Sequence, residues 1–289
     1  MLTIEEILEY LARELQAVYE EPEARTMAEW VLQHVLKVNR FELLSRRREN
    51  APDGLQAAVQ QYQARLLREE PVQYVLREAH FYGREFIVSP AVLIPRPETE
   101  ELVQKVIKIY QNQSGVKLLD IGTGSGCIPI TLAAELPGAQ VWGLDVSAEA
   151  LAVAKTNAAK LGQTINWLQQ DILQEIPAVE PQSLDAVISN PPYVLEAERE
   201  LMRPNVLQYE PALALFVPNE DPLLFYRRIA QVAQQLLKAG GRLFFEINEQ
   251  FASQTQSMLA RMEYKGIKTY QDLRGKDRMV EAIWEGSGA

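Results

Sequence analysis

The apolar positions divide the chain into a helical first part and a later part in which strands alternate with helices. Over residues 1–70, apolar side chains recur at every third or fourth position, the spacing of amphipathic helices. A capping box at Thr3 and Glu6 predicts the start of the first helix, and Pro22 and Pro52 predict the starts of two more. The positions expected to face inward are Ile4, Ile7, Leu8, Leu11, Leu15, Val18, Met27, Ala28, Val31, Leu32, Val35, Leu55, Val59, Tyr62 and Leu66. We expect a small helical bundle that recognises a partner, because it contains no glycine loop or paired acids.

Residues 71–95 connect this bundle to the rest of the chain. Residues 81–83 and 86–88 flank a short turn and predict a β-hairpin. Prolines at positions 90, 95 and 97 then stiffen the path into the next domain.

Residues 96–289 show the alternation that is typical of an α/β domain. The predicted strands cover residues 116–121, 140–145, 165–170, 184–189, 242–247, 267–271 and 279–284, and the predicted helices cover residues 127–134, 148–161, 221–238 and 250–263. Such alternation favours a mostly parallel sheet with helices on both faces. The last two strands are joined by too few residues for a crossover helix, so we expect them to be antiparallel. The polar residues 196–208 lack a clear period and predict a mobile lip over a substrate.

A glycine-rich loop follows the first of these strands. Asp120 lies near the end of the strand, and Gly122, Thr123, Gly124, Ser125 and Gly126 follow. Glycine at every second position allows the backbone to approach a ligand closely. The dinucleotide fingerprint fails because Cys127 occupies its third glycine position, and no Lys-Ser/Thr pair makes a P-loop. The loop with its acid suits a cationic nucleoside without phosphates, such as S-adenosylmethionine.

Two further acids follow the next two strands. The carboxylate of Asp145 could accept both hydroxyls of a ribose. Asp171 could accept from an adenine amino group, with Ile172 packed on the ring. Each acid alone is more often a turn residue. Because the strand ends meet at one edge of the sheet, the three acids and the glycine loop together predict a cofactor site.

The most informative motif is Asn190, Pro191, Pro192 and Tyr193, which follows the largely apolar run of residues 184–189. Two consecutive prolines must end that strand. The Asn190 side chain and the Pro191 carbonyl can each accept an N–H group, and Tyr193 can stack on a planar group. The motif therefore predicts a clamp for an amide or an amine.

These motifs resemble those of class I S-adenosylmethionine-dependent methyltransferases that act on nitrogen. More narrowly, the chain resembles the HemK/PrmC family, the protein-(glutamine-N5) methyltransferases of peptide-chain release factors. The resemblance is carried by EPVQYVLREAHFYGREFIVSPAVLIPRPETE at 70–100, LLDIGTGSGCIPI at 118–130, LDVSAEALAVAKTNA at 144–158, ISNPPYV at 188–194 and DLRGKDR at 272–278. The segment IPRPETE at 94–100 separates this family from other enzymes with an Asn-Pro-Pro-Tyr motif.

The resemblance implies a Rossmann-like, mostly parallel seven-stranded sheet, with Asn190 and Tyr193 as catalytic residues. It also implies that Asn190 and the segment containing Arg96, Pro97, Glu98 and Thr99 lie near the cofactor, although a helix N-cap explains Thr99 equally well. The implied substrate is the glutamine in the Gly-Gly-Gln tip of class-1 release factors. The chain departs from the family where glycine is usual, at Arg77, at Asn248 and in residues 216–220.

The composition and charge of the chain bear on the alternative functions that the motifs allow. The motif also fits methyltransferases that act on amino groups of RNA or DNA, but a net charge of −10 and a pI near 5.0 disfavour a nucleic-acid substrate. A non-catalytic adaptor for release factors or the ribosome would not need the glycine loop, the acids or the clamp. One cysteine and the lack of a signal peptide or an 18-residue apolar run predict a cytoplasmic protein. We expect a monomer without a metal site. Arg46, Arg47 and Arg48 could meet an acidic patch on a partner or form a solvated loop.

Overall fold

The computed structural model describes residues 2–286 and divides into two compact units. The first comprises the chain up to Glu78 together with Arg203–Tyr209, and the second comprises Ala79–Met202 and the chain from Glu210 onward. Residue 1 and residues 287–289, the outer limits of the predicted domains, lie outside the described residues. Each unit has its own hydrophobic core and is described separately.

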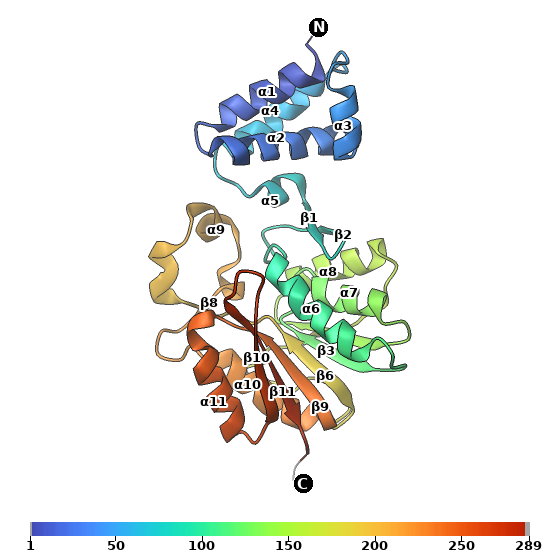
Figure 1. Cartoon of the computed structure of the whole chain (residues 1–289), viewed down its shortest axis with the longest axis vertical. Coiled ribbons are helices and arrows are strands. Elements are labelled where there is room, and N and C mark those ends of the chain that lie inside the picture. Colours follow the sequence, from blue (N-terminus) through green and yellow to red (C-terminus); the bar gives the residue numbers. More distant parts are fainter. Residues whose placement is uncertain (1, 287–289) are drawn as a thin grey trace. The chain divides into compact units, whose positions relative to one another are not determined.

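The first unit is a bundle of short helices (Figure 1). These are α1 (Ile4–Leu15), α2 (Glu21–Leu36), α3 (Arg40–Arg46), α4 (Leu55–Leu66) and α5 (Val72–Leu76). The predicted capping box is confirmed, because Thr3 and Glu6 exchange side-chain and backbone hydrogen bonds. The predicted inward positions form its core, with one exception. Val18 is 38% exposed, because α1 ends three residues earlier.

Two of these helices, α3 and α5, were not predicted, since each is shorter than two full turns and has little period of its own. The segment after α3 is also ordered. It runs beside the start of α1, where Glu5 N donates to Arg47 O at 2.8 Å and Ile4 N donates to Glu49 O at 3.1 Å. Arg46 pairs with Glu49 at 3.0 Å, and Arg47 pairs with Glu5 at 3.7 Å. Arg46 is the last residue of α3, so the interpretation as a loop is wrong for it, whereas Arg47 and Arg48 lie in an exposed turn, in agreement with a solvated loop.

The predicted lip also has regular structure. It contains the 3₁₀ helix η1 (Glu196–Leu201) and the helix α9 (Pro204–Tyr209). Helix α9 belongs to the helical unit, where the Tyr209 hydroxyl donates to the Arg68 carbonyl at 3.0 Å. The residues on either side of α9 belong to the second unit. The chain thus leaves the second unit shortly after the Asn-Pro-Pro-Tyr motif and returns to it at Glu210.

A hairpin is present as β1 (Glu78–Phe81) and β2 (Arg84–Ile87), but its turn lies two residues earlier than predicted, at Tyr82 and Gly83. Its two turn residues, Tyr82 and Gly83, have φ angles of +49° and +70°. Two consecutive positive φ angles give the turn whose twist matches that of a two-residue hairpin.

The second unit is built on a seven-stranded sheet in the order β10-β11-β9-β6-β3-β4-β5. The strands are β3 (Lys117–Ile121), β4 (Gln140–Asp145), β5 (Asn166–Gln169), β6 (Leu184–Ser189), β9 (Leu237–Glu246), β10 (Lys265–Gln271) and β11 (Asp277–Trp284). Neighbours from β9 to β5 are parallel, whereas β11 runs antiparallel to both β9 and β10. Both the mostly parallel sheet and the antiparallel last pair are therefore confirmed.

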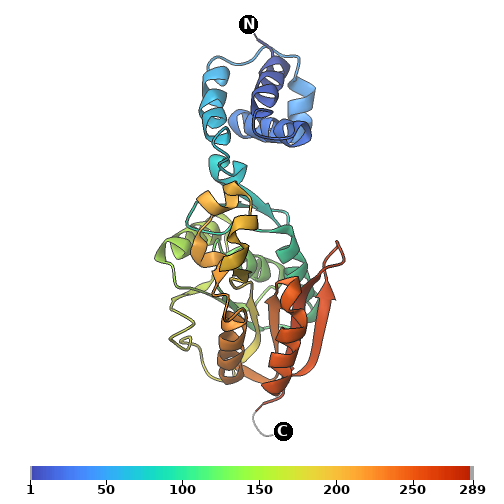
Figure 2. The same ribbon diagram turned by 90° about the vertical axis from the view of Figure 1, so that its left-hand side faces the viewer.

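Helices cover both faces of this sheet (Figures 1 and 2). One core contains side chains of α6 (Pro97–Tyr110), α7 (Cys127–Glu135) and α8 (Ala148–Lys160). The other contains side chains of α10 (Leu224–Leu236) and α11 (Ala252–Arg261). All six residues of the central strand β6 are buried, Asp185 and Ser189 included, as expected for a central parallel strand that is covered on both faces.

The prediction was wrong at the start of β9. A helix was expected over residues 221–238, but α10 ends at Leu236 and β9 begins at the next residue. A positive φ of +81° at Gly240 lets the chain turn within this irregular start, where the register with β6 shifts. Two short strands, β7 (Val194–Leu195) and β8 (Phe216–Val217), pair in parallel beyond the main sheet.

Candidate active site

The carboxyl ends of three neighbouring strands bring the predicted motifs to one edge of the sheet. The backbone N–H groups of Gly122 and Thr123 both donate to Leu144 O, at 2.8 and 3.0 Å, which joins the loop after β3 to the end of β4. On the other side, Ser189 Oγ donates to Ile121 O at 2.6 Å, which joins the ends of β6 and β3. The glycine loop, Asp145 and Asn190 therefore share one edge, as predicted.

The glycine loop has the backbone that its sequence requires. Gly122, Gly124 and Gly126 all have positive φ angles, between 52° and 80°. A Cβ on Gly126 would lie 2.8 Å from the side chain of Ile130, so this position is closed to larger residues. A Cβ on Gly122 would lie 4.0 Å from the backbone oxygen of Asn190. The loop and the Asn-Pro-Pro-Tyr motif are thus immediate neighbours.

This loop holds a group of buried polar atoms without partners. Both carboxylate oxygens of Asp120 and the hydroxyls of Thr123 and Ser125 have no hydrogen-bond partner of normal geometry within the described part of the chain, although Thr123 lies near enough to Asp120 to favour its ionised form. Asp120 is 0% exposed, and this burial raises the pKa of its carboxyl to about 7. Buried polar groups without partners are costly, so their concentration here marks a site for a polar ligand.

The acids after β4 and β5 differ in their surroundings. Asp145 accepts from the backbone N–H of Gly124 at 2.8 Å and of Ser147 at 2.9 Å, and burial raises the pKa of its carboxyl. It therefore also fixes the middle of the glycine loop. Asp171 accepts from Leu173 N and from the Gln174 side chain in the turn after β5. Ile172 is buried beside it.

The Asn-Pro-Pro-Tyr motif begins immediately after β6 ends at Ser189. The side-chain nitrogen of Asn190 donates to the Thr99 hydroxyl at 3.2 Å. The Tyr193 hydroxyl donates to Glu246 at 3.2 Å, and its backbone oxygen accepts from the Asn248 side chain at 3.3 Å. Both ends of the motif are therefore held by neighbouring elements.

Glu246, at the end of β9, is the polar centre of this network. It is 1% exposed, and its second oxygen accepts from the Thr99 hydroxyl at 2.6 Å. Burial raises the pKa of the Glu246 carboxyl, opposed by the Thr99 hydrogen bond and by the charge of Arg278. Helix α6 begins at Pro97 with Arg96 as its N-cap, so the interpretation of Thr99 as an N-cap is wrong.

The segment before α6 has a second anchor. Glu210, whose side chain is buried, accepts from the Arg96 guanidinium at 2.6 Å and from Ile94 N at 3.3 Å. This carboxylate ties the start of α6 to the point where the chain returns from α9. The Arg96 side chain is therefore held by an ion pair with the buried Glu210 carboxylate.

The sequence did not identify three of the residues that hold the site together. These are Glu210, Glu246 and Asn157 on α8, whose side-chain nitrogen donates to Ser125 O in the glycine loop at 2.9 Å. The only signal for Glu246 was a charged residue at the end of an otherwise apolar strand. Glu210 and Asn157 stood in polar surroundings and gave no signal. Their roles depend on contacts between residues far apart in the sequence.

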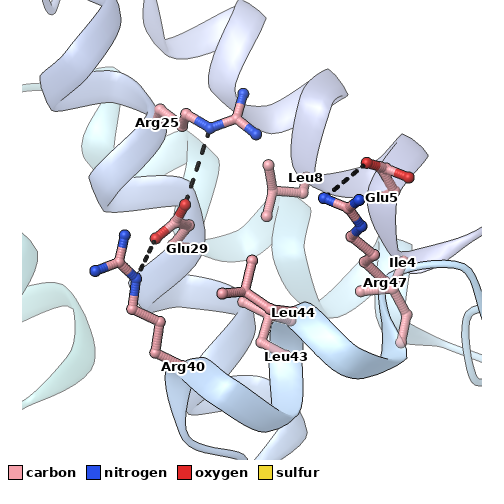
Figure 3. A pocket seen from close by; sticks show the side chains of 9 residues that line it. All are labelled: Ile4, Glu5, Leu8, Arg25, Glu29, Arg40, Leu43, Leu44 and Arg47. Carbon is pink, nitrogen blue, oxygen red and sulfur yellow. Dashed lines mark ion pairs between the residues drawn. The ribbon is translucent and has the colours of Figure 1, made fainter.

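A hollow in the helical unit has a different character (Figure 3). Apolar side chains of α1 and α3 form its floor, and Arg25, Arg40 and Arg47 line it together with Glu5 and Glu29. Glu29 pairs with Arg25 and Arg40, and Glu5 pairs with Arg47. Both carboxylates in its lining are thus paired with arginines. Among the described residues, no group of three or more His, Cys, Asp or Glu could hold a metal ion.

Comparison with known proteins identifies the family. Residues 6–76 match the family model of the PrmC N-terminal domain, and residues 112–281 match that of a methyltransferase domain. A release factor glutamine methyltransferase of Bacteroides thetaiotaomicron is 41% identical over 276 residues, covering 96% of this chain and 98% of the relative. This chain belongs to the release factor glutamine methyltransferase family. A member from Koribacter versatilis is 36% identical, again with 96% and 98% covered.

The fold of this family member is that of a class I S-adenosylmethionine-dependent methyltransferase, as predicted. A crystal structure of a methyltransferase from Pyrococcus furiosus superposes with a TM-score of 0.52 at 18% identity, covering 78% of this chain and 98% of that one. Its similarity concerns the fold alone. Among the described residues, no helix is long and apolar enough to cross a membrane.

The cofactor of this methyltransferase is S-adenosylmethionine, and the site has the chemistry to hold it. The cofactor carries an amino group, a sulfonium and a ribose diol, and the glycine loop offers a buried acid, two unpartnered hydroxyls and a second acid. These acids and hydroxyls therefore fit a cationic nucleoside. It does not fit a phosphate, because a buried carboxylate would repel one.

Proposed function

We propose that this chain methylates the side-chain nitrogen of the glutamine in the Gly-Gly-Gln tip of peptide-chain release factors, with S-adenosylmethionine as the donor. The observation that carries the proposal is the position of Asn190 beside the glycine loop. Asn190 Oδ1 and the Pro191 carbonyl accept no hydrogen bond from any residue between 2 and 286. Two acceptors therefore remain at the loop for a carboxamide.

The clamp answers a chemical difficulty of this reaction. A carboxamide nitrogen is a poor nucleophile because its lone pair is delocalised into the carbonyl. Asn190 Oδ1 and the Pro191 carbonyl each accept one amide hydrogen, which fixes the nitrogen and raises its electron density. Tyr193 stacks on the amide plane, and Pro192 keeps that wall rigid. Most of the rate then comes from positioning and from fixed dipoles, and no strong base is needed before transfer.

The cofactor is assigned to the residues of the glycine-loop edge. Gly122, Thr123, Gly124, Ser125 and Gly126, with the buried Asp120, hold its charged amino-acid part. Asp145 accepts the ribose hydroxyls, and Asp171 and Ile172 hold the adenine. Asn190 closes the pocket toward the acceptor. When bound, the cofactor supplies an electrophilic sulfonium methyl group.

The helical unit is assigned to the release factor, which it contacts away from the glutamine. Of its basic residues, Arg48 is exposed and has no ion pair among the described residues. We assign the protein as a cytoplasmic monomer with a protein substrate rather than a nucleic acid, consistent with its net charge of −10.

The test is incubation of the purified protein with S-adenosylmethionine labelled at the methyl group and with a purified release factor. Label is expected in the factor and not in its Gly-Gly-Gln variant with alanine in place of glutamine. Parallel samples contain bulk tRNA, rRNA and DNA. Label in nucleic acid, or equal label in the alanine variant, would overturn the proposed substrate.

A further inference from the structure

We propose that Thr99 and Glu246 are positioning residues that hold the side-chain amide of Asn190 with its oxygen toward the acceptor. The inference rests on the proposed function and adds to it what decides the orientation of the clamp. Neither residue needs to touch the substrate or the cofactor. Their effect passes through Asn190 and Tyr193.

The Thr99 hydroxyl has a single proton to donate. The hydroxyl lies 2.6 Å from Glu246 Oε2, and Thr99 and Glu246 are 3% and 1% exposed. The charge of Arg278 and the hydroxyls of Thr99 and Tyr193 favour the ionised form of Glu246, which has no proton to give, so Thr99 is the donor in this bond. A short hydrogen bond to a buried charged acceptor is strong, and water cannot compete for it there.

The oxygen of Thr99 can then only accept a further bond. Its other neighbour is the side-chain amide of Asn190, at 3.2 Å. Because only the NH₂ end of that amide can donate, the nitrogen must face Thr99 and the oxygen must face away. The chain of bonds from Glu246 through Thr99 thus selects one of two orientations that are nearly identical in shape.

The selected orientation is the one the reaction needs. With Asn190 reversed, its NH₂ group would meet the NH₂ group of the glutamine, and two donors would face each other. The acceptor nitrogen would lose a bond that holds it and would be repelled from its place. An asparagine without a fixed orientation would hold the substrate correctly only part of the time.

Glu246 also holds Tyr193, which forms the aromatic side of the clamp. Glu246 Oε1 accepts from the Tyr193 hydroxyl at 3.2 Å. The charged or titratable side chains that interact with Glu246 include Tyr193, Tyr226 on α10, Cys127 on α7, Arg278 on β11 and Glu98 on α6. Both Glu246 oxygens are therefore occupied, which suits a positioning role and not that of a base.

The experiment compares Thr99→Val with Thr99→Ser in the full-length protein. Valine has the shape of threonine without the hydroxyl, whereas serine keeps the hydroxyl. We expect kcat for release-factor methylation to fall about 10- to 100-fold in Thr99→Val, the usual effect of losing a residue that orients an active-site group. The Kd for S-adenosylmethionine and the KM for the release factor should stay within about twofold, because Thr99 is buried and its hydroxyl is already bonded to Glu246 and Asn190. Thr99→Ser should retain most of the activity.

A second substitution tests the carboxylate. In Glu246→Gln the side chain has only one oxygen, whereas the hydroxyls of Thr99 and Tyr193 both donate to Glu246 in the wild type. At least one of these two hydrogen bonds must therefore reverse or break. We expect a loss of kcat similar to that of Thr99→Val, again without loss of cofactor binding. Thr99→Ala carries the same expectation as the valine variant should the valine variant not fold, as judged by its Tm.

A wild-type kcat in Thr99→Val or Thr99→Ala would overturn the positioning role, as would an equal loss in Thr99→Ser. A loss confined to KM or to cofactor affinity would overturn it too. These outcomes are distinct from failure of the proposed function, in which the wild-type protein itself would not methylate the release factor.

Discussion

The side chain of Asn157 is hydrogen bonded to both backbone groups of Ile87. Its Oδ1 accepts from Ile87 N at 2.7 Å, and its Nδ2 donates to Ile87 O at 2.9 Å. The same nitrogen donates to Ser125 O at 2.9 Å. Asn157 lies on α8 and is 0% exposed, so one buried amide joins the hairpin strand β2 to the glycine loop.

Replacement of Asn157 by alanine should therefore destabilise the protein by about 2–4 kcal/mol. Two backbone groups of Ile87 and one of Ser125 would lose a partner, and each unsatisfied buried group costs about 1–3 kcal/mol before relaxation. Urea unfolding measures the loss. Asn112→Ala, which removes an exposed asparagine, is the control and should change stability by less than about 0.5 kcal/mol. Equal stability of the two variants would show that the Asn157 bonds contribute little.

Arg77→Gly should stabilise the protein by about 1 kcal/mol. Arg77 ends α5 with a φ of +62°, a left-handed conformation that costs a residue with a Cβ about 1–2 kcal/mol. Its side chain is exposed, so little is lost with it. Arg77→Ala is the matched control and should bring no gain, because alanine has the same strain. A gain in both variants would point to the charge and not to the backbone.

Asp120→Asn should remove a pH dependence from the stability of the ligand-free protein. Burial raises the pKa of this carboxyl from 3.8 to about 7, so the folded chain keeps a proton that the unfolded chain has lost. Its contribution to stability therefore falls as the pH rises from about 4 to about 7 and is constant above. The Tm of the variant should exceed that of the wild type by about 10 °C above pH 7 and converge with it near pH 4.

The Tm difference between the two proteins, followed from pH 4 to pH 8, isolates this group from all others. A difference that does not change with pH would contradict the assignment. Since Asp120 is also proposed to hold the cofactor, the same variant should bind S-adenosylmethionine at least about tenfold more weakly.

Cys127 should be inert in the folded protein. The thiol is buried at the start of α7, and burial raises its pKa to about 12. The nucleophilic thiolate is therefore almost absent at pH 8. A thiol reagent at pH 8 should modify the protein only in denaturant, and Cys127→Ala should retain methyl transfer. Rapid labelling of the native protein with loss of activity would contradict this.

The strands of the parallel sheet were predictable because their sequences carry two signals at once. Residues 184–189 are an apolar run ended by two prolines, and the observed strand β6 has those bounds. Residues 140–145 end in an acid at the sheet edge, and β4 again agrees. Burial on both faces requires a continuous, mainly apolar segment. The prolines or the acid at its end then mark where the strand stops.

Short elements could not be predicted, because tertiary contacts decide them. Helix α3 has seven residues and only Leu43 is buried, so its sequence carries almost no period. Helix α9 contains no buried residue at all. Helices of this length are marginal alone, so what stabilises them lies elsewhere in the fold.

The sequence shows at which positions the chain departs from the family, but it does not show the structural effect of each departure. Arg77 takes the strained backbone that a glycine would relieve. Asn248 does not, because its φ is −69°. Its side chain instead donates to the Tyr193 carbonyl and accepts from Gln250 N. One departure thus leaves strain, whereas the other adds a contact to the motif.

The central claim is that Asn190 holds the amide that is methylated, and turnover by Asn190→Ala tests it most directly. Single-turnover methylation of a purified release factor should fall at least about 10²- to 10³-fold, the usual effect of removing one fixed polar group from a reacting centre. Calorimetry should give a Kd for S-adenosylmethionine within about twofold of the wild type. Methylation at a near wild-type rate by this variant would contradict the account.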